Sequence, residues 1–100
     1  LIETSVMLHL DPEHVDMSQA EAFPSFAAEL VEKCRYLSAT GNIQFGWMAQ
    51  DLNSSGAVGD PSRATAEAGK EIVQAASANL IELIGETASF DLSALSDEGG

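Results

Sequence analysis

The sequence predicts an α/β fold of which these 100 residues form one part. Two stretches of helical periodicity, 2–10 and 26–37, precede a strand pattern at 43–49, and the loop 53–61 leads into a long helix. A single strand leaves both of its edges unpaired, and even an isolated pair of strands is only marginally stable. We therefore expect this strand to join a sheet whose other strands belong to sequence outside this chain.

The first two helices are predicted from apolar residues that recur on one face. Ile2, Val6 and Leu10 are spaced four residues apart, as on one side of a helix. Asp11-Pro12 should end this helix, because proline lacks a backbone donor and disfavours helix at the residue before it. The second helix should end at Thr40-Gly41. Its apolar residues repeat at i, i+4, i+8 and i+11 and are Phe26, Leu30, Cys34 and Leu37.

Two further periodicities predict the strand and the long helix. A period-2 pattern that is typical of a half-buried strand is formed by Ile43, Phe45, Trp47 and Ala49, which alternate with Asn42, Gln44, Gly46 and Met48. Asp60 is expected to cap the long helix, with Pro61 in its first turn and Gly85 as its C-terminal cap. We interpret 1–92 as part of a single domain and 93–100 as an acidic flexible tail. The apolar stripe of the long helix comprises Ile72, Val73, Ala76, Leu80, Leu83 and Ile84.

Charge and composition exclude several classes of partner. Sixteen acidic side chains against four basic ones give a net charge of −12, which repels nucleic acid and anionic membrane surfaces. The longest apolar runs are shorter than the roughly 20 residues that a membrane span needs. A single cysteine, Cys34, allows no internal disulfide framework. We therefore expect a cytoplasmic protein with no nucleic-acid or membrane partner.

Two blocks of this sequence resemble patterns of the creatininase (creatinine amidohydrolase) family. The segment 1–8 is similar to the second half of His-Ala-Gly-x-x-Glu-Thr-Ser-x-Met-Leu, whose histidine would precede Leu1. The segments 46–51, 56–61 and 64–69 are similar to the family's C-terminal block, which contains Gly-Val-x-Gly-Asp-Pro and Ala-Thr-Ala-Glu-Lys-Gly. The blocks occur in the family's order, and Ala68 stands where lysine is common.

The resemblance implies the C-terminal part of a three-layer α/β/α domain in a homo-oligomeric amidohydrolase. It implies divalent metal ions, Zn, Mn or Fe, that activate water to attack an amide carbonyl, in a cyclic amide such as creatinine. The family's metal ligands would all precede Leu1, so the resemblance implies no metal ligand in this chain. The N-terminal part of the same enzyme is then the required partner, and a small-molecule amide is the substrate.

Glu3 is the one family active-site position that the resemblance assigns to this chain. Its implied role is to orient or tune the missing histidine or the bound water. The alternative is structural, because a carboxylate in the first turn of a helix interacts favourably with the helix dipole. Trp47 and Asp51 are candidates for substrate binding, with a core role and a loop-capping role as their respective alternatives.

The remaining chemically active side chains have structural interpretations. His9 and His14 are five residues apart, which is not the i, i+4 spacing of two ligands on one helix face. Cys34 is interpreted as a small core residue, while Thr4 and Ser5 are expected to serve helix capping and packing. A second functional hypothesis also stands: a non-catalytic acidic interaction subunit whose apolar faces dock on a partner protein.

Overall fold

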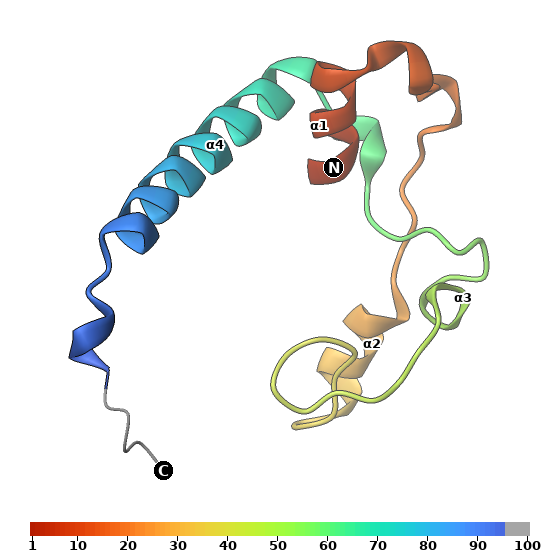
Figure 1. Ribbon diagram of the computed structural model, residues 1–100. Helices are drawn as coiled ribbons and strands as arrows, with labels where there is room; N and C mark the ends of the chain where they lie inside the picture. Colours follow the sequence, from red (N-terminus) through yellow and green to blue (C-terminus); the bar gives the residue numbers. More distant parts are fainter. Residues whose placement is uncertain (96–100) are drawn as a thin grey trace.

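The computed structural model describes residues 1–95 and shows an open arrangement of helices (Figure 1). The long helix α4 runs away from α1 on one side, while an extended segment on the other side leads to α2 and α3. The helices are α1 (Ile2–Leu10), α2 (Phe26–Lys33), α3 (Ala49–Leu52) and α4 (Ala66–Ser89). Short 3₁₀ turns lie at Pro12–His14, Met17–Gln19, Pro61–Arg63 and Leu92–Ala94.

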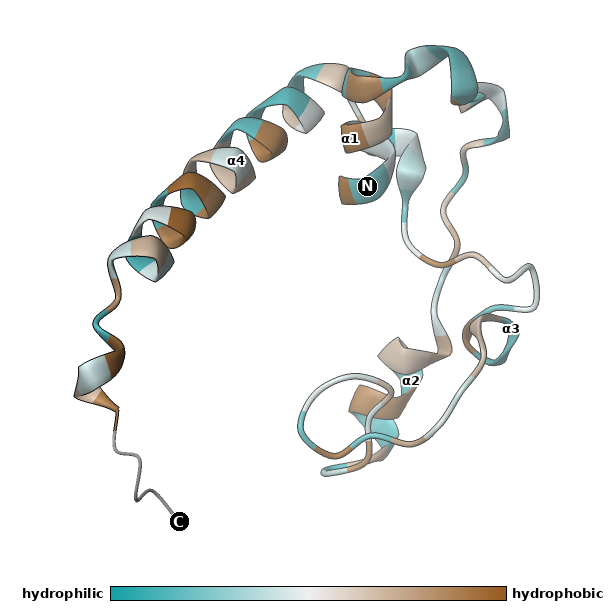
Figure 2. Ribbon diagram, viewed as in Figure 1, coloured by the Kyte–Doolittle hydropathy of each residue, from teal (hydrophilic) through white to brown (hydrophobic). Residues whose placement is uncertain are grey.

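The described chain buries little apolar surface. Its radius of gyration is 19.5 Å, whereas a compact domain of this length has about 13 Å. Ile81 and Leu92 expose 69% and 75% of their surface, and apolar residues make up much of the C-terminal half of α4 (Figure 2). The buried hydrophobic residues are Leu30, Ala39, Leu52 and Ala64. These helices therefore present apolar faces that need another surface to cover them.

The structure confirms the first predicted helix and shortens the second. The helix α1 ends before Asp11, whose backbone N–H bonds to the carbonyl of Met7. In α2, the Ser25 hydroxyl caps the N-terminus by accepting from the backbone N–H of Ala27. This helix ends at Lys33 rather than near Thr40, because Cys34 already has an extended backbone. The prediction that Cys34 shares a helix face with Phe26 is therefore wrong.

The predicted strand at 43–49 is also wrong for the part of the chain that the structure describes. This segment has one isolated bridge, between Ser38 and Gln44, and its last residue, Ala49, begins α3. An extended segment becomes a strand only when a neighbour pairs with it, and no adjacent strand lies within 1–95. The described residues are mostly helical, and they do not show the sheet of an α/β domain.

The long helix exists, but its ends differ from the prediction. Asp60 caps only the 3₁₀ turn that follows it, by accepting from the backbone N–H of Ser62. Thr65 caps α4 by accepting from the backbone N–H of Ala68 at 3.1 Å. Gly85 is not a C-terminal cap, because α4 continues for another turn in which the Ser89 hydroxyl donates to the Gly85 carbonyl at 2.9 Å.

The predicted acidic tail is only partly described. A 3₁₀ turn occupies Leu92–Ala94, and Asp91 caps it; residues 96–100 lie outside the described residues. Within 1–95, no helix combines the length and apolarity that crossing a bilayer requires.

Candidate functional site

The two sequence blocks that carry the family resemblance meet where α1 crosses the start of α4. Ser5 of α1 has no exposed surface, and its hydroxyl accepts a hydrogen bond from the backbone N–H of Thr65 at 3.2 Å. Gly69, one turn into α4, lies directly against the backbone of Ser5. A Cβ atom at Gly69 would stand 1.8 Å from the Ser5 carbonyl oxygen, so only glycine fits this crossing.

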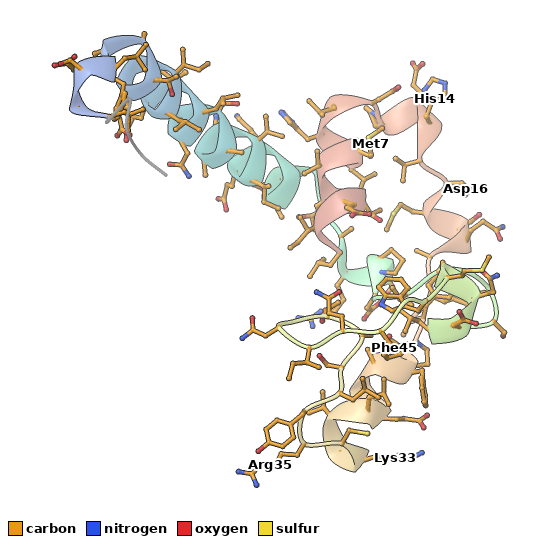
Figure 3. The ribbon with its side chains drawn as sticks, turned by 60° about the horizontal axis from the view of Figure 1, so that its bottom comes forward. Met7, His14, Asp16, Lys33, Arg35 and Phe45 are labelled. Carbon is orange, nitrogen blue, oxygen red and sulfur yellow. The ribbon has the colours of Figure 1, made fainter. Side chains whose placement is uncertain are left out.

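Glu3 lies near the start of α1, exposed, on the rim of two surface hollows. The first, here called the turn hollow, has a volume of about 340 Å³ and lies between α1 and the turns that follow it. Met7, His14 and Asp16 lie along this end of the chain (Figure 3). The second, here called the loop hollow, has a volume of about 540 Å³. Besides Glu3, its lining includes Ile2, Phe23, Val58, Gly59 and Asp60.

A short antiparallel bridge holds the wall of the loop hollow. The backbone N–H of Phe23 donates to the carbonyl of Gly59 at 2.7 Å, and the N–H of Gly59 donates back to Phe23 at 2.9 Å. Gly59 has a φ of +101°, a conformation that residues with a side chain rarely adopt. Gly59 therefore occupies a position in the loop that favours glycine. Its loop also brings Asp60 and Pro61 into the same hollow as Glu3.

The turn hollow carries polar groups that are held by local hydrogen bonds. His14 Nδ1 lies 2.7 Å from Asp11 Oδ2 in an exposed pair. Asp16 accepts from the Ser18 hydroxyl at 2.5 Å and from the Ser18 backbone N–H at 3.0 Å. These bonds, the hydroxyl first, lower the pKa of the Asp16 carboxyl because they stabilise its charged form. The turn hollow is therefore lined by hydrogen-bonded polar groups as well as by Glu3.

Metal ligation by protein side chains needs several suitable groups in one place. Among residues 1–95, no group of three His, Cys, Asp or Glu side chains could hold a metal ion. The side chains around Glu3 therefore do not fit a metal site by themselves.

The other two predicted site residues lie apart from the hollows at Glu3. Trp47 donates from its indole Nε1 to the carbonyl of Ala39 at 2.7 Å. Asp51 accepts from the backbone N–H of Met48 at 2.8 Å, at the start of α3. Neither side chain lines the turn hollow or the loop hollow. The structure thus joins Glu3 to the Gly59 loop but not to these two residues.

Two residues that line these hollows, Phe23 and Asp16, were not predicted from the sequence. Phe23 lines the loop hollow because its backbone pairs with Gly59, which lies far along the chain. No local sequence pattern predicts such a pairing. Asp16 carries a weak signal, because an aspartate two residues before a serine is typical of a capped turn.

The comparisons with known proteins agree on one family. The family model described as "Creatininase: Creatinine amidohydrolase" matches residues 1–84. No curated protein matches the chain significantly. The crystal structure of a protein from Bacteroides fragilis NCTC 9343, assigned as a creatinine amidohydrolase, is 32% identical, with a TM-score of 0.67. The match covers 91% of this chain and 34% of that protein, so this chain spans about a third of its length. With most of its residues matched by the family model, the chain belongs to the creatininase family.

Proposed function

We propose that this chain is the C-terminal part of a divalent-metal-dependent amidohydrolase that hydrolyses a C–N amide bond in a cyclic amide such as creatinine. The family match over residues 1–84 supports the reaction class. The observation that supports a site in this chain is the position of Glu3 beside the loop hollow, which the second sequence block also lines.

Glu3 is proposed to act on a group that the rest of the enzyme supplies. Its carboxylate is exposed at the start of α1, so it is accessible to an incoming side chain. If that side chain is the histidine that the family pattern places before Leu1, Glu3 would accept its imidazole N–H. Such a contact fixes the imidazole tautomer and raises its basicity. Glu3 then prepares the proton-transfer group rather than transferring the proton itself.

The metal ligands are proposed to come from the N-terminal part of the same enzyme, because the described residues contain no cluster that could supply them. This N-terminal part is therefore the proposed partner, in a cytoplasmic homo-oligomer that binds Zn, Mn or Fe. The apolar faces exposed on α4 give such a partner a surface to cover.

The lining of the loop hollow combines apolar and acidic side chains, which suits a small polar ring. Phe23 and Val58 supply apolar surface, while Glu3 and Asp60 supply carboxylates. Small-molecule sites commonly combine an apolar lining with a few polar groups that fix orientation. A substrate-binding role for Trp47 and Asp51 stays a prediction, and it requires another part of the enzyme or a second copy to bring them to the substrate.

The proposal is tested on the complete protein that contains this chain. Creatinine and other cyclic amides are incubated with the purified enzyme, and the ring-opened product is quantified by chromatography while bound metal is measured by mass spectrometry. We expect turnover that is lost after chelation and restored by one of the divalent metals. The alternative, a non-catalytic acidic interaction subunit, predicts no turnover at any metal loading and a stable complex with a separate protein.

A further inference from the structure

We infer that Gly69 is a positioning residue for Glu3: its contact with Ser5 sets how closely α1 approaches α4, and thereby where Glu3 stands over the two hollows. The inference rests on the proposed function, because it assigns Gly69 an influence on the reaction that Glu3 supports. Gly69 itself contacts neither hollow.

The contact at Gly69 involves backbone on both sides. A Cβ atom there would lie 1.8 Å from the Ser5 carbonyl oxygen, 2.4 Å from the Ser5 carbonyl carbon and 2.9 Å from the Val6 nitrogen. No side-chain rotation can relieve these overlaps, since all three atoms belong to the helix backbone. Any larger residue must therefore move α1 away from α4 until the shortest separation reaches ordinary contact, 3.4 Å or more.

This movement would reach Glu3 directly. Glu3 and Ser5 lie within the same short helix, and its backbone hydrogen bonds make it move as one body. The facing wall of the loop hollow has its own anchor, the pair of hydrogen bonds between Phe23 and Gly59. A displaced α1 would therefore change the distance between Glu3 and that wall. Displacements of about 1 Å can lower a catalytic rate by about 100-fold.

Ser5 offers a way to separate positioning from stability. Its hydroxyl accepts from the Thr65 backbone N–H, so Ser5→Ala removes a stabilising bond without adding any atom at the crossing. Gly69→Ala instead adds an atom and forces the helices apart. Both changes should destabilise the protein, but only the second should displace Glu3. Gly85→Ala is the matched control, because a Cβ at Gly85 of the same helix meets nothing within 4 Å.

The test measures kcat, KM and melting temperature for these variants of the complete enzyme, together with Glu3→Gln and the double variant Glu3→Gln/Gly69→Ala. We expect Gly69→Ala to lower kcat by about tenfold or more, with KM changed by less than about threefold. Ser5→Ala should keep kcat while lowering the melting temperature. Gly85→Ala should keep kcat without lowering the melting temperature, because alanine favours the helix more than glycine does. Because Gly69 acts through Glu3, Gly69→Ala should lower kcat little further in the Glu3→Gln background.

Two kinetic outcomes overturn the inference. One is an unchanged kcat in Gly69→Ala despite a lower melting temperature, and the other is a double variant whose loss of kcat equals the product of the two single losses. If Gly69→Ala does not fold, Ser5→Thr replaces it, because this change keeps the hydroxyl and adds one methyl group at the same crossing. Crystal structures of the wild type and the variant give a readout independent of activity. A Glu3 carboxylate in the same place in both overturns the inference, whereas a wild-type enzyme inactive on every cyclic amide overturns the proposed function instead.

Discussion

The Ser5 hydroxyl accepts a hydrogen bond from the backbone N–H of Thr65 at 3.2 Å, across 60 positions of the chain. Ser5 is fully buried, and Thr65 is the N-cap of α4, where backbone N–H groups have no partner within the helix. One polar contact therefore satisfies a helix end and joins the two family sequence blocks. In the described residues, which bury little apolar surface, this contact stabilises the α1–α4 crossing, while the close approach at Gly69 sets its spacing.

Replacing Ser5 by alanine should destabilise the complete protein. The Thr65 N–H would lose its acceptor, and the loss of one intramolecular hydrogen bond typically lowers the free energy of unfolding by about 0.5–1.5 kcal/mol. Denaturant unfolding of the wild type and Ser5→Ala measures the difference. Ser77→Ala, an exposed position on α4, is the control and should change stability little. Coincident curves for wild type and Ser5→Ala would show that the bond contributes nothing.

Glu3→Gln should slow hydrolysis while leaving the fold and the oligomer intact. Loss of a carboxylate that orients a neighbouring catalytic or metal-binding group typically lowers activity or metal affinity by about 10–100-fold. Steady-state kinetics with metal content measured in parallel checks this, and Glu13→Gln, a second exposed glutamate, is the control. Wild-type turnover in Glu3→Gln, or a Glu3 carboxylate facing bulk solvent in the complete enzyme, would contradict the assignment.

Gly59→Val should strain the backbone that lines the loop hollow. Valine at a φ of +101° is strained, and such a conformation costs about 1–3 kcal/mol. The strain should lower the melting temperature and weaken substrate binding, because the Gly59 backbone pairs with Phe23. Gly46→Val is the control, since Gly46 has no positive φ and its Cβ would meet open space. Full activity with an unchanged melting temperature in Gly59→Val would show that the loop is only a connector.

Sequence patterns predicted the helices, whose formation depends on residues that are close together in the sequence. The apolar spacing of Ile2, Val6 and Leu10 with the following proline predicted α1, and the apolar stripe predicted α4. Features that depend on distant residues were missed. The strand at 43–49 had a suitable pattern, but pairing needs a neighbouring strand that the described residues do not provide.

The same distinction holds for the candidate site. Glu3 and the Gly59 loop were recognised separately from sequence patterns, whereas their placement in one hollow results from the α1–α4 crossing and the Phe23 bridge. Trp47 and Asp51 were chosen from a predicted strand end. Because that strand is absent from 1–95, no sheet edge within these residues carries them toward Glu3.

The hydrogen bonds at Asp16 make the stability of this turn depend on pH. Because Ser18 stabilises the charged carboxylate, the folded-state pKa of Asp16 lies below its unfolded value. Its contribution to stability is therefore present above the unfolded pKa and is lost as the pH falls through the folded pKa. Ser18→Ala should raise the pKa, measured by carbon NMR of the carboxyl group. Asp91, which Ser93 holds in the same way, is the internal control and should keep its lowered pKa.

Expressed alone, this chain should not form a stable enzyme. Its large apolar side chains, among them Val31 at 74% and Ile81 at 69% exposure, have no cover within the described residues. Uncovered apolar surface of this kind promotes association and aggregation. We expect the isolated chain to aggregate or stay partly unfolded and to bind no stoichiometric Zn or Mn, as followed by light scattering, circular dichroism and metal analysis. Coexpression with the N-terminal part should restore a soluble complex that binds metal. A monomeric isolated chain that melts cooperatively would contradict the proposal that the apolar faces are completed by that part.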